Sequence, residues 1–504
     1  MGEQLVTPFN LKAIDFQWLP ILPLITIALA AIVVLLVGVR VDDEESEGLG
    51  WLAAASIAIA FVLTLAMSGQ NTSAFSGSIA IDDFAVFFEL AILFVAAFVV
   101  LMSLSYATET RLPGAEYYSL ILFAALGMML MAAAGDLIII FIGLETMSIA
   151  IYVLAGLKRS DPRSNEAAIK YFLLGAFSTG FLLYGIALVY GATGTIKLEP
   201  IRNALAHGIG LGSPLLLLGV GMMLIGFGFK IAAVPFHMWT PDAYEGAPTP
   251  ITAYMATGVK LAAFAGFLRV FPLHLSAISA DWTWVLWIMA ALTMTVGNVV
   301  ALVQTNIKRM LAYSAIAHAG YLLVAMAAAV PEAGAAMLFY LVGYVVANLG
   351  AFGVVIALER RGISNDMIED YRGLAQREPA LAAAMTIFLL SFTGVPPLVG
   401  FVGKFYIFSG ALQGGLIWLV VIAVLNSVMA AYYYIYVIVA MYMQEGGVAV
   451  RSMTLRPGLV ATIAIALIAT ILIGVYPSPY MNAASTAFNS ALGLGPIHAA
   501  SLLP

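Results

Sequence analysis

The 504-residue sequence is 63% hydrophobic and only 10% charged, and its net charge at pH 7 is −6. A soluble protein carries roughly 25% charged residues, so most of this surface must face something other than water. The sequence has no cysteine, which excludes disulfides, thiolate-held iron–sulfur clusters and thiol catalysis in this chain. Nucleic acid is not an expected partner, because much of the negative charge gathers in one loop. That loop holds Asp42, Asp43, Glu44, Glu45 and Glu47.

Apolar stretches long enough to cross a membrane follow one another along the chain. A membrane-crossing helix needs about 20 predominantly apolar residues. The first stretch lacks the basic start and small-residue cleavage site of a signal peptide, so we interpret it as a retained span. We predict fourteen spans, at 17–39, 50–67, 84–105, 117–134, 137–156, 167–190, 214–238, 249–271, 282–303, 307–329, 333–358, 380–412, 416–443 and 459–476. Very short turns, at 135–136 and 304–306, separate the fourth span from the fifth and the ninth from the tenth.

The positions of lysine and arginine predict the orientation, because cytoplasmic loops of membrane proteins are rich in both. Loops after odd-numbered spans hold thirteen basic residues and the opposite side holds four. We therefore expect the odd-numbered loops to face the cytoplasm and both termini to lie outside. The thirteen are Arg40, Arg111, Lys158, Arg159, Arg163, Lys308, Arg309, Arg360, Arg361, Arg372, Arg377, Arg451 and Arg456, and the four are Lys12, Lys197, Arg202 and Arg269.

The other four basic residues, all lysines, fall inside spans, and so does Glu145. These residues are Lys170, Lys230, Lys260, Lys404 and Glu145. A charge at the bilayer centre costs roughly 2.5–3.5 kcal/mol, so we expect these groups to be paired or hydrated and to have a function. Lysine suits proton transfer better than arginine, because a buried ammonium group can release its proton whereas a guanidinium group stays charged.

Each buried group also has a structural alternative. Lys170 is about one turn into its span, and its long side chain can instead reach the cytoplasmic interface. Glu145 can serve as a buried counter-ion to a lysine. His318, in the tenth span, can be a hydrogen-bonded packing residue, although an ordinary pKa of about 6.5 suits a relay between two lysines.

Prolines interrupt two spans at depth. Pro235 lies in the seventh span, and Pro396 and Pro397 lie in the twelfth. Proline removes a helical hydrogen bond, and broken helices in lipid are tolerated only where they are buried in protein or line a wet cavity. The breaks are five spans apart, and a repeat of five helices, an odd number, inserts upside down relative to its partner. We predict an all-α membrane protein with two inverted five-helix repeats, spans 4–8 and 9–13.

A longer motif surrounds the first break. Residues 236–250 read FHMWTPDAYEGAPTP, with Lys230 before them and Lys260 after them. This segment resembles the antiporter-like subunits of proton-pumping NADH:quinone oxidoreductase (respiratory complex I), which are related to Mrp-type cation/proton antiporter subunits. The form of the motif, Lys404 in place of a glutamate, and the lack of a long lateral helix are most similar to subunit N. Supporting stretches are Gly143–Glu145, Lys170–Phe177, Ala312–His318 and Gly394–Pro397.

The resemblance implies a role for each buried group. It implies that Glu145 pairs with Lys230, and that Lys170 is a further lysine of the sixth span. Lys260 and His318 would form a central relay, and Lys404 would face the external exit. Protons would enter from the cytoplasm and leave outside, driven by quinone reduction in partner subunits and passed on by coupled titration.

The same resemblance sets expectations for partners and organisation. Because the sequence has no dinucleotide fingerprint or metal-ligand cluster, FMN, iron–sulfur clusters and quinone are expected in partner subunits of the membrane protein complex. These partners include further antiporter-like subunits of the membrane arm, in a bacterial inner membrane. Two other functions stay open, an independent antiporter exchanging Na⁺ or K⁺ for H⁺ and a structural connector. The expected divisions are a three-helix segment (1–110), the two repeats (111–275 and 276–445), and a C-terminal helix and tail (446–504).

Overall fold

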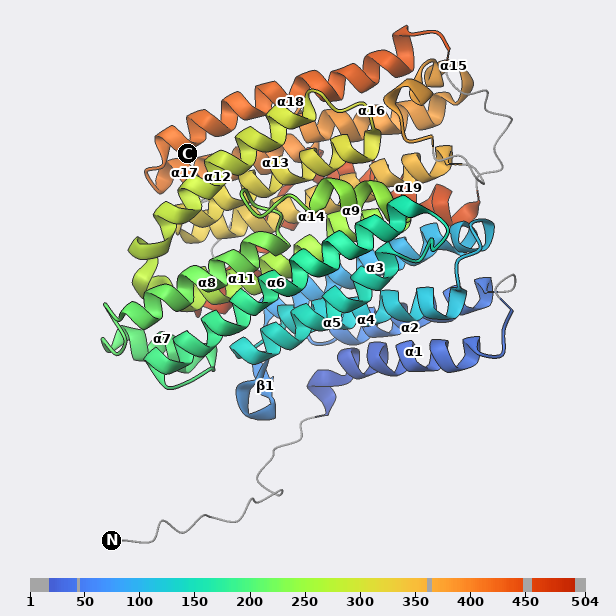
Figure 1. The fold of residues 1–504 in the computed structure, drawn as a ribbon. Coiled ribbons are helices and arrows are strands. Elements are labelled where there is room, and N and C mark those ends of the chain that lie inside the picture. The colour runs from blue at the N-terminus through green and yellow to red at the C-terminus, as the bar shows by residue number, and fades with distance from the viewer. Residues whose placement is uncertain (1–17, 43–45, 360–364, 447–455, 495–504) are drawn as a thin grey trace, which may run out of the picture.

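The computed structural model describes residues 18–42, 46–359, 365–446 and 456–494. Long helices run side by side in one elongated bundle, with α1, α2, α4 and α5 on one side and α16 to α18 on the other (Figure 1). Among the described residues, twelve helical stretches are long and apolar enough to cross a membrane. They are η2 with α1 (Leu19–Ile21, Leu22–Gly38), α2 (Glu47–Leu65), α3 (Asp83–Glu109), α4 (Gly114–Ala132), α5 (Leu137–Ala155), α6 (Pro162–Thr193), α10 with η5 and α11 (Thr249–Tyr254, Met255–Val259, Lys260–His274), η6 with α12 (Ser276–Ile278, Ser279–Ala301), α13 (Ile307–Ala328), α14 (Pro331–Leu358), α18 (Ile417–Met443) and α19 (Pro457–Val475).

The seventh and twelfth predicted spans are broken, as expected, but their helical parts are shorter than the predicted ranges. The range 214–238 contains α8 (Pro214–Lys230), and the range 380–412 is divided into α16 (Pro379–Thr393) and α17 (Val399–Gln413). Both helices end before the prolines, because Ala232 and Gly394 take positive φ angles of 62° and 93° that a right-handed helix does not allow. By length and composition, α8 and α16 are apolar but too short to count as spans.

Several shorter elements were not predicted from the sequence. Besides helices, the described residues contain an antiparallel hairpin of β1 and β2, in which Thr72 lies opposite Ile81. The hairpin rests on the turn between α4 and α5, where the Ala80 amide donates to the Ala133 carbonyl at 2.7 Å. The prediction of an all-α fold therefore omitted a small sheet. The short elements are β1 (Thr72–Ala74), η4 (Phe75–Gly77), β2 (Ile79–Ile81), α7 (Leu198–Ala206), α9 (Thr240–Gly246), η7 (Ile368–Tyr371), α15 (Leu374–Arg377) and α20 (Ser478–Leu492).

Helices α11, α13 and α14 form the inside of the bundle. The most apolar stretch of 249–274 is 100% buried and those of α13 and α14 are 94% buried, against 33% for α2. Helices α19 and α20 pack against α14 and α3, and so join the two sides of the bundle. The inner helices carry two of the predicted ionisable residues, which are thereby kept away from lipid.

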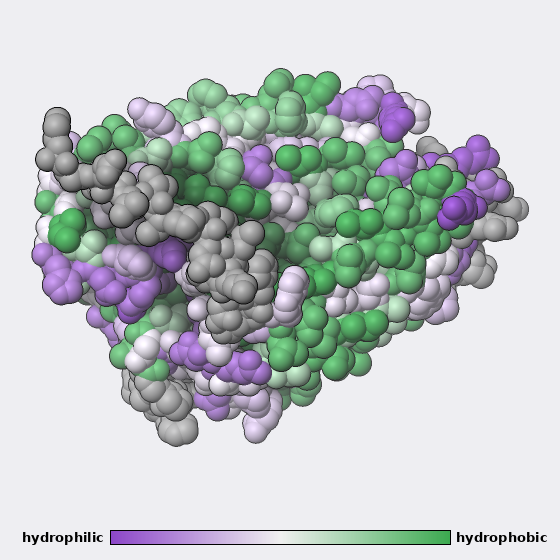
Figure 2. All heavy atoms as spheres, turned by 90° about the horizontal axis from the view of Figure 1, so that it is seen from below, coloured by the Kyte–Doolittle hydropathy of each residue, from purple (hydrophilic) through white to green (hydrophobic). Residues whose placement is uncertain are grey.

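The outer surface is apolar over most of its length. In Figure 2, apolar residues cover the middle of the visible face, and polar residues gather toward its two ends. Phe177 and Val428 are 70% and 69% exposed. Such an apolar surface is typical of a protein whose solvent is lipid, because soluble proteins rarely expose large apolar patches.

Some residues used in the sequence analysis lie outside the described part of the chain. They are Lys12, Asp43, Glu44, Glu45, Arg360, Arg361 and Arg451.

Candidate functional site

Four of the predicted proton-transfer residues are buried inside the bundle on four different helices. Lys230 ends α8, Lys260 begins α11, His318 lies in α13 and Lys404 lies in α17. Their exposed fractions are between 2% and 4%. Glu145, in α5, is partly buried. A buried ionisable group needs polar partners, and each of these side chains finds different ones.

Lys230 lies among aromatic side chains. Its Nζ donates a hydrogen bond to the Tyr152 hydroxyl at 3.0 Å. The same Nζ lies 5.0, 5.3 and 5.6 Å from the ring centres of Tyr152, Tyr171 and Phe229. Ring faces attract cations, so this pocket favours an ammonium group even without a carboxylate in contact with it.

Glu145 does not form a direct ion pair with Lys230. Tyr152 follows Glu145 by two helical turns on the same face of α5, and it is Tyr152 that bonds the lysine. Glu145 nonetheless lies within electrostatic range of Lys230. Its Oε1 is buried and has no hydrogen-bond partner among the described residues. The pairing implied by the family resemblance is thus a longer-range electrostatic interaction in this structure, and the direct hydrogen bond of Lys230 goes to Tyr152.

Lys260 follows a π-helical turn. The turn, η5, covers the five residues before it, in a stretch that is otherwise α-helical. The Lys260 Nζ donates to the Ala315 carbonyl and lies 5.7 Å from the centre of the Tyr344 ring. A π-helical turn changes the direction of the side chains after it, and such turns are frequent at functional sites. The sequence analysis did not predict this turn.

His318 has a tyrosine hydroxyl at each ring nitrogen. Nδ1 contacts the Tyr340 hydroxyl, and Nε2 lies 3.2 Å from the Tyr434 hydroxyl. Tyr434 also shares a hydrogen bond with Ser314. His318 lies one turn after Ala315 on α13. Lys260, which bonds the Ala315 carbonyl, therefore contacts α13 close to His318.

Lys404 lies at the broken end of α16. Its Nζ donates to the carbonyls of Phe392 at 2.9 Å and Thr393 at 3.1 Å, and to Ser427 Oγ at 2.8 Å. The last carbonyls of a helix have no intrahelical partner and carry partial negative charge, so the break creates a site for a cation. The ring centre of Tyr321 is 4.8 Å from this Nζ and 5.8 Å from that of His318.

Lys170 is not part of this buried line. It forms ion pairs with Glu166 and Asp242, both at 2.6 Å, and 42% of its side chain is exposed. Asp242 also pairs with Arg309 at 2.7 Å, and Arg309 with Glu245 at 2.8 Å. These pairs tie α6 and α13 to α9, the short helix after the first break.

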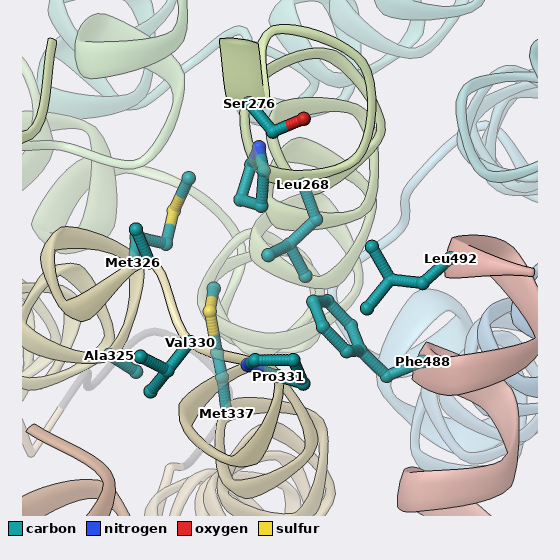
Figure 3. Close-up of a pocket in the computed structure, with 12 residues that line it drawn as sticks. Leu268, Ser276, Ala325, Met326, Val330, Pro331, Met337, Phe488 and Leu492 are labelled. Atoms are coloured by element: carbon teal, nitrogen blue, oxygen red, sulfur yellow. The ribbon is translucent and has the colours of Figure 1, made fainter. Parts of the chain in front are cut away.

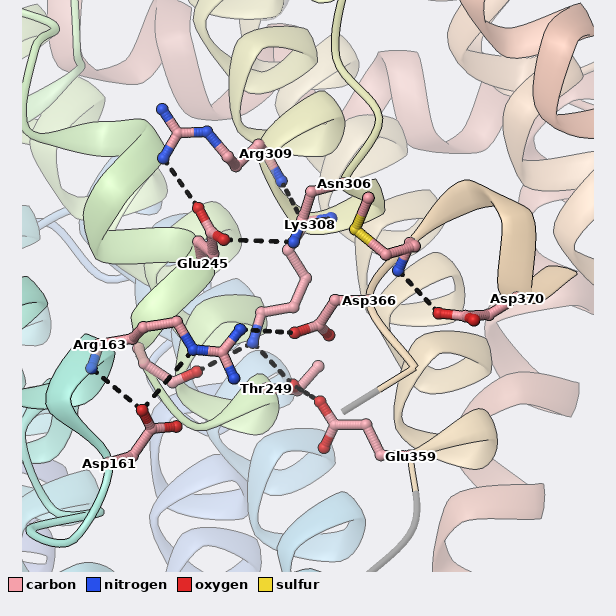
Figure 4. A network of polar contacts seen from close by, with 12 residues as sticks. Asp161, Arg163, Glu245, Thr249, Asn306, Lys308, Arg309, Glu359, Asp366 and Asp370 are labelled. Carbon is pink, nitrogen blue, oxygen red and sulfur yellow. Dashed lines mark hydrogen bonds and ion pairs between the residues drawn. The ribbon is translucent and has the colours of Figure 1, made fainter. Parts of the chain in front are cut away.

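A second part of this polar network lies next to the segment that leads to Lys260 (Figure 4). Lys308, counted from the sequence among the basic residues of the cytoplasmic loops, is only 4% exposed. Its Nζ donates to the Ala247 carbonyl at 3.2 Å and to Thr249 Oγ1 at 3.3 Å. Thr249 in turn donates to Glu359 at the end of α14. The start of α10 is therefore attached to both α13 and α14.

Sequence reasoning missed a buried ionic cluster and misplaced one arginine. Arg269, assigned to an outer loop, lies within α11 and is 3% exposed. Its guanidinium donates two hydrogen bonds to Asp82, at 2.9 and 2.8 Å. Glu89, in α3, is 7% exposed and accepts a hydrogen bond from Thr64 at 3.5 Å. A glutamate within an apolar span was the sequence signal for this cluster.

No metal centre is evident in the described residues. They contain no group of three or more His, Asp or Glu side chains that could hold a metal ion. One apolar cavity of about 130 Å³ lies between α11, α13, α14 and α20, lined by residues such as Met337, Phe488 and Leu492 (Figure 3). None of the predicted ionisable residues lines it.

Comparison with known proteins agrees with the family resemblance. A sequence profile described as "NADH:quinone oxidoreductase/Mrp antiporter, TM" matches residues 134–430. The chain is 50% identical, over 426 residues, to NADH-quinone oxidoreductase subunit N of Trichlorobacter lovleyi, which covers 84% of this chain and 88% of that protein. A chain of respiratory complex I from Thermus thermophilus with bound aureothin superposes with a TM-score of 0.78 at 35% identity, covering 92% of this chain and 99% of that one. A chain of the Mrp complex from Dietzia sp. DQ12-45-1b shares the fold, with a TM-score of 0.80 at 19% identity and coverage of 95% and 98%.

The helix bundle, its apolar surface and its buried lysines define a multi-pass membrane protein with ionisable groups in its interior. The profile match and the 50% identity show that the chain belongs to the NADH:quinone oxidoreductase/Mrp antiporter family, within its subunit N group.

Proposed function

We propose that the chain is a membrane-arm subunit of an NADH:quinone oxidoreductase and translocates protons, driven by quinone reduction in partner subunits. The observation that carries this proposal is the line of buried Lys230, Lys260, His318 and Lys404. Ionisable groups inside a membrane protein are costly, and they mark ion and proton pathways. Relatives that are 50% and 45% identical bear the name subunit N, which supports the same assignment. The activity of the whole complex is then that of a proton translocase.

Protons pass from Lys260 through His318 to Lys404, from the cytoplasmic side to the outside. The two histidine nitrogens contact the hydroxyls of Tyr340 and Tyr434, and a hydroxyl can both donate and accept a proton. Tyr321 lies between His318 and Lys404. The carbonyls at the end of α16 favour the protonated form of Lys404 until the proton leaves.

Glu145 and Lys230 form the end of the line that responds to a neighbouring subunit. A change of charge at Glu145 alters how readily Lys230 holds its proton, and this change passes along the line as coupled titration. Electrostatic contact between the two residues without an ion pair supports this role, because Lys230 then stays free to exchange its proton.

Lys170 has a different role in this proposal. Its ion pairs with Glu166 and Asp242 and its exposed position support anchoring of α9, rather than a place in the buried line.

The topology we propose has fourteen spans, with α8 and the pair α16–α17 completing the twelve long stretches, and with both termini outside. Two equivalent bridges support inverted repeats of spans 4–8 and 9–13. The backbone of Asp136, just before α5, forms an isolated antiparallel β-bridge with that of Lys197 after α6. The backbone of Asn306, just before α13, forms the same kind of bridge with that of Met367 after α14. The breaks that follow α8 and α16 also occupy equivalent places in the two repeats.

The remaining chemistry belongs to other subunits in this proposal. FMN, iron–sulfur clusters and quinone are assigned to partners, and further antiporter-like subunits lie beside this one in a bacterial inner membrane. A chain of complex I from Thermus thermophilus with the same fold and 35% identity supports this setting.

Replacement of Lys230 by arginine tests the proposal directly. Arginine keeps the positive charge but cannot release its proton, so Lys230→Arg is expected to lower proton pumping by roughly tenfold or more while assembly persists. The measurement is NADH-driven proton uptake by proteoliposomes that contain the assembled enzyme. Lys197→Arg is the matched control, because the Lys197 ammonium lies outside the buried line and bonds the Ser76 carbonyl. Full pumping by an assembled Lys230→Arg enzyme would refute the role of Lys230 and favour the structural connector.

An independent antiporter is the second candidate, favoured by the fold shared with a chain of an Mrp complex. In that case the purified chain alone, in vesicles, would exchange Na⁺ or K⁺ for H⁺. Proton movement that is seen only with the assembled complex, and only while it oxidises NADH, supports the first function.

A further inference from the structure

Glu89 is a buried carboxyl group that the proposed proton line does not use. It lies within α3, is 7% exposed, and has apolar residues on both sides of it in the sequence. Among the described residues, its hydrogen-bond partner is the Thr64 hydroxyl in α2, which donates to Glu89 Oε2 at 3.5 Å. An ionisable group inside a membrane span is costly, and its presence there marks a functional site.

No cationic side chain forms an ion pair with Glu89 among the residues that the structure describes. The nearby Arg269 guanidinium is already bound, because it donates two hydrogen bonds to Asp82 and one to the Ala132 carbonyl at 2.5 Å. A carboxylate that is buried without a counter-ion in contact is strongly disfavoured, and such a group takes up a proton instead. The resting form of Glu89 is therefore the neutral carboxylic acid.

The ionised form of Glu89 also has support nearby. The charges of Arg269 and Asp82 both lie within electrostatic range of Glu89. A positive charge close to a carboxyl group stabilises the carboxylate that forms when the proton leaves, and so does the hydrogen bond that Thr64 donates. Glu89 is thus placed where it can both hold a proton and release it, which a proton-transfer group requires.

Glu89 lies at about the same depth in the bundle as Lys260. The Asp82–Arg269 pair joins the start of α3 to the last turns of α11, so the two helices extend from this pair into the bundle together. Glu89 follows Asp82 by seven residues and Lys260 precedes Arg269 by nine, which places them about 10 Å and about 14 Å from the pair along their helices. Helix α3 also packs against α11 and against η5, the turn before Lys260. Glu89 therefore lies beside the lysine line, on its α3 side.

Polar groups continue from the Asp82–Arg269 pair to one end of the bundle. The Arg269 carbonyl lies 2.5 Å from Nδ1 of His274, the last residue of α11. Nε2 of the same histidine is 3.9 Å from the carboxylate of Glu199 in α7, whose side chain is 54% exposed. Figure 1 shows α7 at the opposite end of the bundle from α15. This is the outer end in the topology proposed above, so the polar groups lead from the inside of the bundle to its outer surface.

We propose that Glu89 is a proton-transfer residue on a side branch of the lysine line, and that this branch leads past the Asp82–Arg269 pair to the α7 end. The inference rests on the proton-translocating function proposed above. The Glu89 carboxylic acid releases one proton toward the α7 end, and its carboxylate then takes one proton from the lysine line. Glu89 thereby returns to its starting form. Asp82 and Arg269 are positioning residues, because they hold α3 against α11 and keep their own charges.

Replacement of Glu89 by glutamine tests the branch. Glutamine keeps the shape of the side chain and accepts the hydrogen bond from Thr64, but it cannot release a proton. Glu89→Gln is expected to lower NADH-driven proton pumping by the assembled enzyme by about half, because the lysine line itself remains intact. Glu89→Asp keeps a carboxyl group and should pump more than Glu89→Gln. Glu109→Gln is the matched control, since Glu109 lies in the same helix but is 54% exposed and pairs with Arg456.

Infrared difference spectra of the assembled enzyme, with and without NADH, test the change of protonation itself. A protonated carboxyl group has its own C=O band. The wild-type enzyme should lose intensity in this band during turnover, Glu89→Gln should lack that loss, and Glu89→Asp should shift the band, so the measurement still tests the inference if the glutamine variant does not assemble.

A difference band that is the same in the wild type and in both variants overturns the inference. Pumping by Glu89→Gln equal to that of Glu109→Gln also overturns it. With a defective Lys230→Arg enzyme, either result leaves the proposed function standing, whereas normal pumping by Lys230→Arg overturns the function itself.

Discussion

Lys230 and Lys404 are both buried, but their ammonium groups meet different surroundings. Lys404 donates three hydrogen bonds, two of them to carbonyls at the end of α16. Lys230 has one hydroxyl and three aromatic rings. Fixed helix carbonyls stabilise a cation at Lys404 whatever the neighbouring groups do. The charge on Lys230 depends more on Glu145, which makes Lys230 the better place for a coupling step.

The Tyr152 hydroxyl fits beside Gly175 only because glycine has no side chain. A methyl group at Gly175 would lie only 1.9 Å from the Tyr152 hydroxyl. Gly175→Ala is therefore expected to displace Tyr152 from Lys230 and lower proton pumping several-fold without removing a titratable group. The measurement is proton uptake by proteoliposomes at matched enzyme content.

Gly180→Ala is the matched control, because Gly180 lies in the same helix with nothing within 4 Å of the added methyl. Equal pumping by the two alanine variants would contradict the positioning role of Tyr152.

At the scale of the helices, an ion pair attaches α11, which carries Lys260, to the start of α3. Arg269 of α11 donates to Asp82, the N-cap of α3, with an Arg269 exposure of 3%. Burial alone raises the pKa of Asp82, but the Arg269 charge together with the hydrogen bonds from Arg269 and the Ala85 amide outweighs it and lowers that pKa below its ordinary value. This pair joins the N-terminal helices to the helix that carries Lys260.

Removal of one partner of this pair is expected to destabilise the protein strongly. Arg269→Ala leaves Asp82 buried without its counter-ion, which costs about 3–5 kcal/mol. The Asp82→Ala and Arg269→Ala double variant should lose less than the sum of the two single variants, because no unpaired charge remains. Denaturant unfolding of the purified protein in detergent measures these free energies. Arg202→Ala, which breaks an exposed pair with Glu199, is the control and is expected to change stability by less than about 1 kcal/mol. An equally small effect of Arg269→Ala would contradict the argument.

Across the whole bundle, a charged network at one end connects segments that are far apart in the sequence. Asp242 in α9 receives hydrogen bonds from Lys170 in α6 and from Arg309 in α13. The network holds the non-helical stretch after α8 against the rest of the protein. It thereby fixes where Lys230 and Lys260 lie relative to each other.

This network predicts how stability depends on pH. Burial by itself raises the pKa of Asp242, but the hydrogen bonds from Lys170 and Arg309 outweigh it and lower the pKa in the folded protein. The stabilisation is therefore present above the unfolded pKa of about 4 and is lost as the pH falls through the lower folded value. Asp242→Asn should lower the melting temperature at neutral pH, by an amount equivalent to about 1 kcal/mol, and have little effect in strong acid.

Thermal unfolding in detergent at neutral and strongly acidic pH checks this dependence. Asp281→Asn, at an exposed position in α12, is the control and should show no such difference between the two pH values. A destabilisation by Asp242→Asn that is equal at both pH values would exclude the ionic explanation.

Composition and local chemistry were enough to predict several features of the molecule. The apolar runs predicted a membrane protein, because the length and hydropathy of a span are properties of one segment. Pro235, Pro396 and Pro397 predicted the two broken helices, because proline disrupts a helix wherever it occurs. The motif after Lys230 was long enough to identify the family.

Contacts between distant segments decided the rest. The bond from Lys230 to Tyr152 joins residues 78 positions apart, and that from Lys260 to Ala315 joins residues 55 apart. The ion pairs that keep Lys170 out of the buried line, and the buried ion pair of Arg269 within α11, depend on partners in other helices in the same way. Whether a charged side chain inside a span meets lipid, a carbonyl, an aromatic ring or a carboxylate is set by how the helices pack. The local pattern in the sequence shows that such a charge needs a partner, and the tertiary structure determines which partner it finds.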